Sequence, residues 1–203
     1  SFQLETAYRY RPDVSLVLNV TPDHGDRYDD LEEYAHTKSN ILSSQTKEQV
    51  AVLSADDKRV ASMASQTEAN VRWFSTLGHQ FEGDGFYLEE DSAHGVGIYA
   101  GSNGLALAHD KLFGRHNREN ALAAFLAVDG LGIVNGNWDD VLKAYQKFAG
   151  LEHRLEWVRE LQGVRFINDS KATNDEAAAV ARKHHPLADA AAPGHGRGHG
   201  RVA

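Results

Sequence analysis

The chain has 203 residues, a formal net charge of -8 and no cysteine. The surplus of acidic groups argues against non-specific binding to nucleic acid or anionic membranes, because both need clustered Lys and Arg. The absence of cysteine excludes disulfides, thiolate metal sites and cysteine nucleophiles. The longest wholly apolar run, 121–128, is far shorter than the ~20 residues of a membrane helix, and the first residues do not read as a signal segment. A cytoplasmic protein without nucleic-acid or membrane partners is the default expectation.

Apolar runs alternate with helical patterns in the first part of the chain. Short apolar runs bounded by polar residues predict buried strands at 15–20, 50–54 and 71–75. Glycines that punctuate 83–109 predict several shorter strands. Periodicity and capping residues predict helices at 29–43, 116–130 and 138–148. Strands interleaved with helices indicate an α/β domain, in which helices flank a sheet.

The pattern changes near residue 150. Two apolar segments, 155–161 and 164–168, flank Gln162-Gly163, a pair that predicts a hairpin turn. The sequence therefore predicts a first domain at 1–149 and the start of a second domain at 150–183.

A polar motif, Thr21-Pro22-Asp23-His24-Gly25-Asp26-Arg27-Tyr28, directly follows the first predicted strand. In open α/β sheets, ligands bind at the carboxyl ends of the strands. A histidine close to two carboxylates could bind a divalent cation such as Mg²⁺ together with phosphate oxygens. The alternative is an Asx-type turn with a solvated His24. Lys38, on the following helix, is by itself an ordinary solvated lysine.

A second polar motif, Asn168-Asp169-Ser170-Lys171-Ala172-Thr173-Asn174, follows the apolar run 164–167, which is also expected to be a buried strand. Asp169 suits ribose hydroxyls, whereas Lys171 and Thr173 suit phosphate or a carboxylate. The alternative is a polar loop with Ser, Thr and Asn turn chemistry. Arg154 could bind phosphate through two parallel hydrogen bonds, although a single arginine in a linker is usually structural.

Two amides lie near the start of the predicted helix at 116–130. Asn117 and Asn120 share one helix face, and an amide offers a donor and an acceptor that match the Watson–Crick edge of adenine. The alternatives are an N-cap at Asn117 and a solvated Asn120.

A phosphate-binding loop of the form G-x-x-x-x-G-K-[ST] occurs nowhere in the 203 residues, so the backbone cradle that usually holds a triphosphate is missing.

At these residues the sequence resembles the Mur ligase family, and specifically its D-glutamate-adding members. The resemblance covers about residues 1–180 in the expected order. Its hallmarks are Ser1-Phe2-Gln3-Leu4-Glu5, residues 18–28, Lys38, residues 114–120, residues 150–156 and residues 168–174. Sister ligases and folylpolyglutamate synthases share the architecture but differ at the first and last of these segments.

The resemblance implies a fold and an activity. The fold would be a partial central ATP-binding domain followed by the start of a Rossmann-like carboxyl-terminal domain. The activity would be ATP-dependent addition of D-glutamate to UDP-N-acetylmuramoyl-L-alanine in peptidoglycan synthesis. ATP would phosphorylate the substrate carboxylate, and the D-glutamate amine would attack the acyl phosphate and expel phosphate. The enzyme would be a monomer that orients the reactants and neutralises developing charge.

The resemblance also implies a metal site. His24 would be a magnesium ligand with Asp23 beside it. Lys38 would carry a carbamate, which turns a cationic side chain into an anionic oxygen ligand. Lys171 would complete the catalytic set.

The remaining matched residues would bind the nucleotide and the substrates. Those that contact the nucleotide would be Asn117, Asn120, Arg154 and Asp169. The phosphate and the incoming D-glutamate would converge at Lys171, with Ser170 and Thr173 as substrate-binding residues.

The sequence departs from the family pattern at both ends. The family's uridine-nucleotide domain, its phosphate loop and a glutamate metal ligand are expected before Ser1, and the segment that holds D-glutamate is expected beyond about residue 180. The Ala-, Gly- and His-rich composition of 184–203 predicts a disordered or aberrant tail. The chain alone is therefore expected to be inactive and, with an exposed sheet edge, prone to aggregation. The alternative is a non-catalytic nucleotide-binding or interaction module of the same fold.

Overall fold

The computed structural model describes residues 2–7, 9–22, 27–79, 81, 83–91, 95–100, 103–106, 109, 112 and 114–172. The chain divides into two compact units, Ser1–Phe148 and Ala149–Ala203, and each is described by itself. The candidate residues His24 and Thr173 and the expected tail at 184–203 lie outside the described residues. Within those ranges, every helix is too short or too polar to span a membrane.

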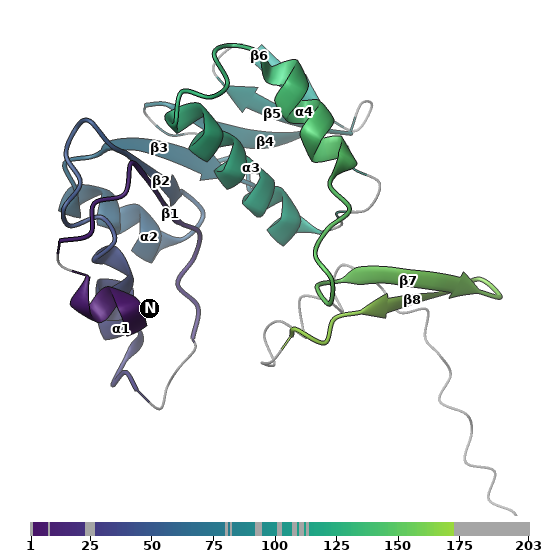
Figure 1. Cartoon of the computed structure of the whole chain (residues 1–203), viewed down its shortest axis with the longest axis horizontal. Helices are drawn as coiled ribbons and strands as arrows, with labels where there is room; N and C mark the ends of the chain where they lie inside the picture. The colour runs from purple at the N-terminus through teal and green to yellow at the C-terminus, as the bar shows by residue number, and fades with distance from the viewer. Residues whose placement is uncertain are drawn as a thin grey trace, which may run out of the picture. The chain divides into compact units, whose positions relative to one another are not determined.

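The first unit contains a six-stranded sheet with the strand order β1-β2-β3-β4-β5-β6 (Figure 1). The strands are β1 (Val14–Val17), β2 (Val50–Ser54), β3 (Asn70–Ser75), β4 (Gly85–Asp91), β5 (Gly95–Ala100) and β6 (Asn103–Ala106). β1 to β4 pair in parallel, whereas the β4–β5 and β5–β6 pairs are antiparallel. The glycine-punctuated segment therefore forms the antiparallel end of the sheet, and the predicted α/β class is confirmed.

Helices cover both faces of this sheet (Figure 1). They are α1 (Leu31–Ser39), α2 (Lys58–Ser62), α3 (Arg115–Gly130) and α4 (Trp138–Lys147). All five residues of β2 are buried, and they alternate between two cores. Val50 and Val52 pack with α3 and α4, whereas Ala51 and Leu53 pack with α1 and α2. A strand that is buried on both faces has a continuous apolar sequence, which is why this strand was predictable.

Two of the predicted boundaries are wrong by three residues or more. β1 ends at Val17 instead of Val20, because the Val20 amide donates to Asp57 Oδ2 at 2.7 Å and leaves the strand ladder. α1 ends at Ser39, earlier than predicted. The Ser39 hydroxyl there donates to the backbone carbonyl three residues earlier at 2.8 Å, a local bond that competes with continued helix.

The short helix α2 has no counterpart among the predicted elements. Asp57 caps it, since Oδ1 accepts hydrogen bonds from the backbone amides of Arg59 at 2.9 Å and Val60 at 3.2 Å. A helix of five residues is too short to show an apolar period. From the sequence, the acidic residues after β2 indicate only where that strand ends.

α3 runs antiparallel to the parallel strands. Near its start, Glu119 Oε1 lies 3.3 Å from Oγ1 of Thr76, which follows the carboxyl end of β3. Near its end, Asp129 forms an ion pair with Arg72 at the beginning of β3. The first turns of α3 therefore lie at the carboxyl edge of the sheet.

The Arg72–Asp129 ion pair joins β3 to α3 and should stabilise the fold. The two side chains are 17% and 36% exposed, and Arg72 Nε has no hydrogen-bond partner in the described part of the chain. Asp129→Asn would leave the guanidinium without its counter-charge, so we expect the free energy of unfolding to fall by about 1–3 kcal/mol in urea denaturation. Glu32→Gln is the matched control, because its partner Arg59 and Glu32 itself are exposed, and it should cost less than about 0.5 kcal/mol. Equal losses would contradict the assignment.

The second unit contains a hairpin of β7 (Glu156–Leu161) and β8 (Val164–Asn168). Gln162 and Gly163 in its turn have φ values of 52° and 79°, the positive values that two-residue hairpin turns need. The predicted hairpin is confirmed. The expected burial of the strand at 164–167 is wrong, since Val164 and Phe166 are 57% and 42% exposed; β8 pairs only with β7 among the described strands. That this unit begins a Rossmann-like domain stays a prediction.

Candidate nucleotide and metal site

Polar groups gather where the parallel strands of the first unit end. Asn19 follows β1, Asp56 follows β2 and Thr76 follows β3. The first turns of α3 lie at the same edge, beside Thr76. Because ligands of open α/β sheets bind at this edge, it is the candidate site of the first unit.

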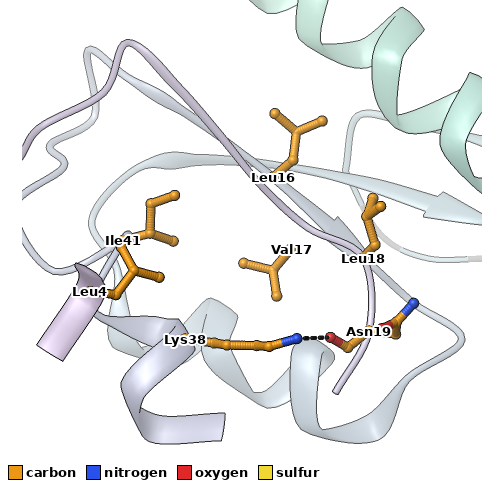
Figure 2. A pocket seen from close by; sticks show the side chains of 7 residues that line it. All are labelled: Leu4, Leu16, Val17, Leu18, Asn19, Lys38 and Ile41. Atoms are coloured by element: carbon orange, nitrogen blue, oxygen red, sulfur yellow. Dashed lines mark hydrogen bonds between the residues drawn. The ribbon is translucent and has the colours of Figure 1, made fainter. Parts of the chain in front are cut away.

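Lys38 lies in the wall of a pocket beside the end of β1 (Figure 2). Its Nζ donates to the carbonyl oxygen of Asn19 at 3.1 Å and lies 4.7 Å from the centroid of the Tyr34 ring. The pocket has a volume of about 310 Å³ and is lined by Leu4, Leu16, Val17, Leu18, Asn19, Lys38 and Ile41. Lys38 supplies the charge in this otherwise largely apolar lining. The half-buried lysine is thus directed at the backbone just before the first polar motif.

Glu5 binds the end of the first polar motif, at Arg27 and Tyr28. Its carboxylate accepts hydrogen bonds from Arg27 Nε at 2.8 Å and Nη2 at 2.5 Å, and from the Tyr28 hydroxyl at 2.9 Å. The hydrogen bonds from Arg27 and Tyr28 lower the pKa of Glu5 to about 2. Residues 23–26, with the candidate ligand His24, lie outside the described residues, but the chain on either side of them is held in place.

The amides predicted to contact adenine lie near the start of α3. The N-cap residue is Gly114, with φ 88° and ψ 158°, a left-handed conformation that favours glycine. Because Gly114 occupies the cap, the alternative of an N-cap at Asn117 is wrong. Asn117 is half-buried and Asn120 is exposed. Their contact with adenine stays a prediction.

The structure brings together four candidate residues of the second unit. The backbone amide of Leu155 donates to Asp169 Oδ1 at 3.2 Å, and the amide of Lys171 donates to the carbonyl of His153 at 3.1 Å. These two bonds hold the loop at 151–155 beside the turn at 168–172. The residues that come together in this way are Arg154, Asp169, Ser170 and Lys171.

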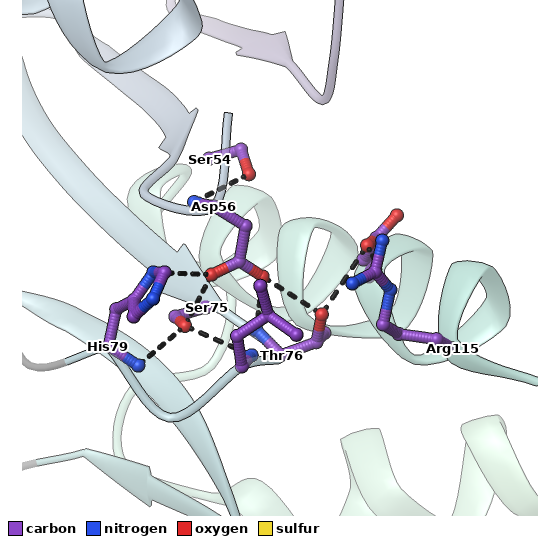
Figure 3. Close-up of polar contacts among 8 residues, drawn as sticks. Ser54, Asp56, Ser75, Thr76, His79 and Arg115 are labelled. Carbon is purple, nitrogen blue, oxygen red and sulfur yellow. Dashed lines mark hydrogen bonds and ion pairs between the residues drawn. The ribbon is translucent and has the colours of Figure 1, made fainter. Parts of the chain in front are cut away.

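A polar network also joins β2, β3 and α3 at the carboxyl edge, and it was not among the predicted sites (Figure 3). The Asp56 side chain is only 8% exposed. Its Oδ1 accepts from Ser75 Oγ at 2.6 Å, and its Oδ2 accepts from the amide and the hydroxyl of Thr76 at 2.7 and 2.9 Å. His79 Nδ1 lies 3.2 Å from Oδ1. The position of these residues directly after predicted strands was a signal that could have indicated them.

Glu119 links this network to α3. Its side chain is 16% exposed, and its Oε1 lies 3.2 Å from Arg115 Nε and 3.3 Å from Thr76 Oγ1. Burial raises the pKa of the Glu119 carboxyl above its ordinary value, against the nearby charge of Arg115 and with a further contribution from Asp56. The carboxyl groups of Asp56 and Glu119 therefore both contact the hydroxyl of Thr76 at the carboxyl edge.

These features define an α/β protein whose polar groups meet at the carboxyl ends of parallel strands. Residues 2–128 match the family described as the Mur ligase middle domain. That match covers more than half of the 203 residues. The chain belongs to the Mur ligase family.

Curated relatives align with nearly the whole chain. Proteins from Natranaerobius thermophilus and Lachnospira eligens are 42% and 39% identical to it, and both are named UDP-N-acetylmuramoylalanine–D-glutamate ligase. The alignments cover 89% of this chain but 38% and 39% of those two proteins. The chain therefore spans about two-fifths of the length of these relatives.

Solved structures of related ligases share the fold. MurF from Acinetobacter baumannii gives a TM-score of 0.65 at 20% identity, over 85% of this chain and 37% of its own. A murein peptide ligase from Psychrobacter arcticus gives 0.58 at 19% identity, over 89% of this chain and 36% of its own. At such identities the likeness shows the fold alone.

Proposed function

We propose that this chain is part of an ATP-dependent ligase that adds D-glutamate to UDP-N-acetylmuramoyl-L-alanine in peptidoglycan synthesis. The observation that carries the proposal is the 42% and 39% identity, over 89% of the chain, to relatives named for that reaction. The polar groups at the carboxyl edge of the first unit support it, because a nucleotide would bind there.

In the proposed reaction the terminal phosphoryl group of ATP passes to the carboxylate of UDP-N-acetylmuramoyl-L-alanine, and ADP leaves. The amine of D-glutamate then attacks the carbonyl carbon of the acyl phosphate and loses a proton. Phosphate departs as the C–N bond forms. The protein would contribute by orienting the reactants and by neutralising the charge that develops on the phosphoryl and carbonyl oxygens.

The proposed magnesium site lies beside the loop after β1. Within the ranges that the structure describes, no group of three or more His, Asp or Glu side chains is placed to hold a metal ion. The proposed ligands are those that the family resemblance implies, His24 and a carbamate on Lys38. The position of Lys38 Nζ, 3.1 Å from the carbonyl oxygen of Asn19, supports this pairing because it lies just before that loop. Bound magnesium would offset phosphate charge.

The nucleotide and the substrates are assigned to both units. Asn117 and Asn120 are proposed to contact adenine from α3. The residues of the second unit proposed to contact the nucleotide, the phosphate or D-glutamate are Arg154, Asp169, Ser170, Lys171 and Thr173. The hydrogen bonds that hold the 151–155 loop beside the 168–172 turn support a joint role for the first four.

The chain alone should not turn over, because its 203 residues contain no phosphate-binding loop. A chimeric ligase, in which residues 1–183 replace the matched region of the Natranaerobius thermophilus relative, should release phosphate only with ATP, UDP-N-acetylmuramoyl-L-alanine and D-glutamate together. A coupled assay of phosphate release measures turnover by the chain alone and by the chimera. His24→Ala in the chimera is the negative control. Turnover by the chain alone, or by the chimera with another amino acid in place of D-glutamate, would contradict the proposal.

A non-catalytic nucleotide-binding or interaction module of the same fold is the second candidate. The fold that the chain shares with solved structures at 19–20% identity is compatible with this candidate as well. A chimera that binds ATP but releases no phosphate under any combination of substrates would support this second function against the first.

A further inference from the structure

The hydroxyl of Thr76 lies between two carboxyl groups. Its Oγ1 is 2.9 Å from Asp56 Oδ2 and 3.3 Å from Glu119 Oε1. A threonine hydroxyl has one proton to donate, so it can donate to only one of the two. The shorter contact, with Asp56, takes that proton. The contact with Glu119 is then a hydrogen bond only if Glu119 supplies a proton of its own.

The surroundings of Glu119 favour such a proton. Within the part of the chain that the structure describes, the groups that face it are Arg115 on its own helix, Thr76 from the loop after β3 and, beyond Thr76, Asp56 from the loop after β2. The cation among them, Arg115, is 51% exposed, and its Nε lies 3.2 Å from Glu119 Oε1. Asp56 is itself in contact with His79, which is 55% exposed.

We propose that Glu119 carries a proton, which it donates to Thr76, and that the resulting chain of hydrogen bonds to Asp56 positions the first turns of α3. Glu119 is thereby a positioning residue for Asn117 and Asn120. This last role rests on the proposed nucleotide contacts of the two amides. The three linked side chains come from the loops after β2 and β3 and from α3. Their hydrogen bonds therefore connect these elements at the carboxyl edge.

The proposal predicts a pH dependence with a definite sign. Because burial raises the pKa of Glu119 above the ordinary value of 4.5, the folded chain holds this proton more tightly than the unfolded chain. The stabilisation is complete below pH 4.5 and is lost as the pH rises through the higher pKa of the folded state. Above that pKa, two carboxylates share one hydroxyl and the first turns of α3 should loosen.

The proton itself can be observed in the full 203-residue chain. With ¹³C-labelled glutamate carboxyl groups, the signal that disappears in Glu119→Gln identifies Glu119. We expect this signal to titrate above 4.5, the ordinary value for the group. Titration at or below that value would overturn the proposal.

Two variants separate a neutral from a charged role. A glutamine amide can donate to Thr76 as a protonated carboxyl does, so Glu119→Gln should keep its urea midpoint at about pH 8, where that of the wild type falls relative to about pH 5. Glu119→Ala, which removes the donor, should have the lower midpoint at both pH values. If Glu119→Gln loses as much as Glu119→Ala, the ion pair with Arg115 is the operative contact and the proposal is wrong.

ATP titration of the chimeric ligase, which supplies the region upstream of Ser1, tests the positioning role. We expect wild-type affinity to fall about fivefold between about pH 5 and about pH 8, the lower end of usual coupling between sites. Glu119→Gln should remove this dependence, and unchanged pH dependence in that variant would overturn the role. If no variant binds ATP at any pH, the assignment of the two amides fails, and the carboxyl titration still decides where the proton lies.

Discussion

Replacing Lys38 by arginine in the chimeric ligase should lower turnover about 10²–10³-fold, the effect of losing one preorganised group that stabilises charge in a transition state. Arginine stays cationic and cannot form a carbamate, so the variant would lack the proposed anionic magnesium ligand. Phosphate release with all three substrates measures the effect. An arginine variant with wild-type turnover would show that the carbamate is not needed.

The same substitution should leave the fold intact, which separates chemistry from stability. Arginine can still donate to the carbonyl of Asn19, where Lys38 Nζ donates at 3.1 Å, and can still lie over the Tyr34 ring. The urea midpoint of the 203-residue chain should therefore change little. Lys143→Arg on α4 is the matched control, because that lysine is 68% exposed, and its turnover should equal that of the unmodified chimera.

A direct test of the carbamate uses ¹³C-labelled bicarbonate. Wild-type chain should show a carbamate carbon signal in the NMR spectrum that Lys38→Arg lacks and Lys143→Arg retains. A signal that remains in Lys38→Arg would come from another lysine. A signal lost in both variants would not be specific to Lys38, and either result would contradict the proposed carbamate.

The sequence predicted the elements whose signal is local. The helix α1 begins where expected because Asp30 caps it, with Oδ1 accepting from the Glu33 amide at 2.8 Å. β2 was predictable from five consecutive apolar or small residues. The hairpin was predictable because the turn conformation is a property of Gln162 and Gly163 themselves. In each case the information lies within a few residues along the chain.

The parts that were missed depend on contacts across the chain. The end of β1 is set by a bond between Val20 and Asp57, and the polar network needs Thr76 to meet Glu119. Both contacts follow from the strand order and from the placement of α3 on the sheet. Apolar periodicity predicts that strands exist but not which ones are neighbours. Asp56 was therefore visible only as the residue that follows a strand.

Replacing Asp57 by alanine should reduce the free energy of unfolding by about 2–4 kcal/mol, the sum of a lost helix cap and a buried amide left without an acceptor. Its Oδ1 caps α2 through the amides of Arg59 and Val60, and its Oδ2 accepts from Val20, a residue only 4% exposed. Urea denaturation of the 203-residue chain measures the loss.

Asp57→Asn separates the two functions of this carboxylate. Asparagine is as good an N-cap residue as aspartate, so α2 should stay capped, but an amide nitrogen in place of Oδ2 would face the Val20 amide, donor against donor. We therefore expect a smaller loss of about 1–3 kcal/mol. Amide hydrogen exchange should speed up at Val20 in both variants, and at Arg59 and Val60 only in Asp57→Ala. Protected exchange at Val20 in Asp57→Asn would show that contacts other than the bond to Asp57 hold this amide.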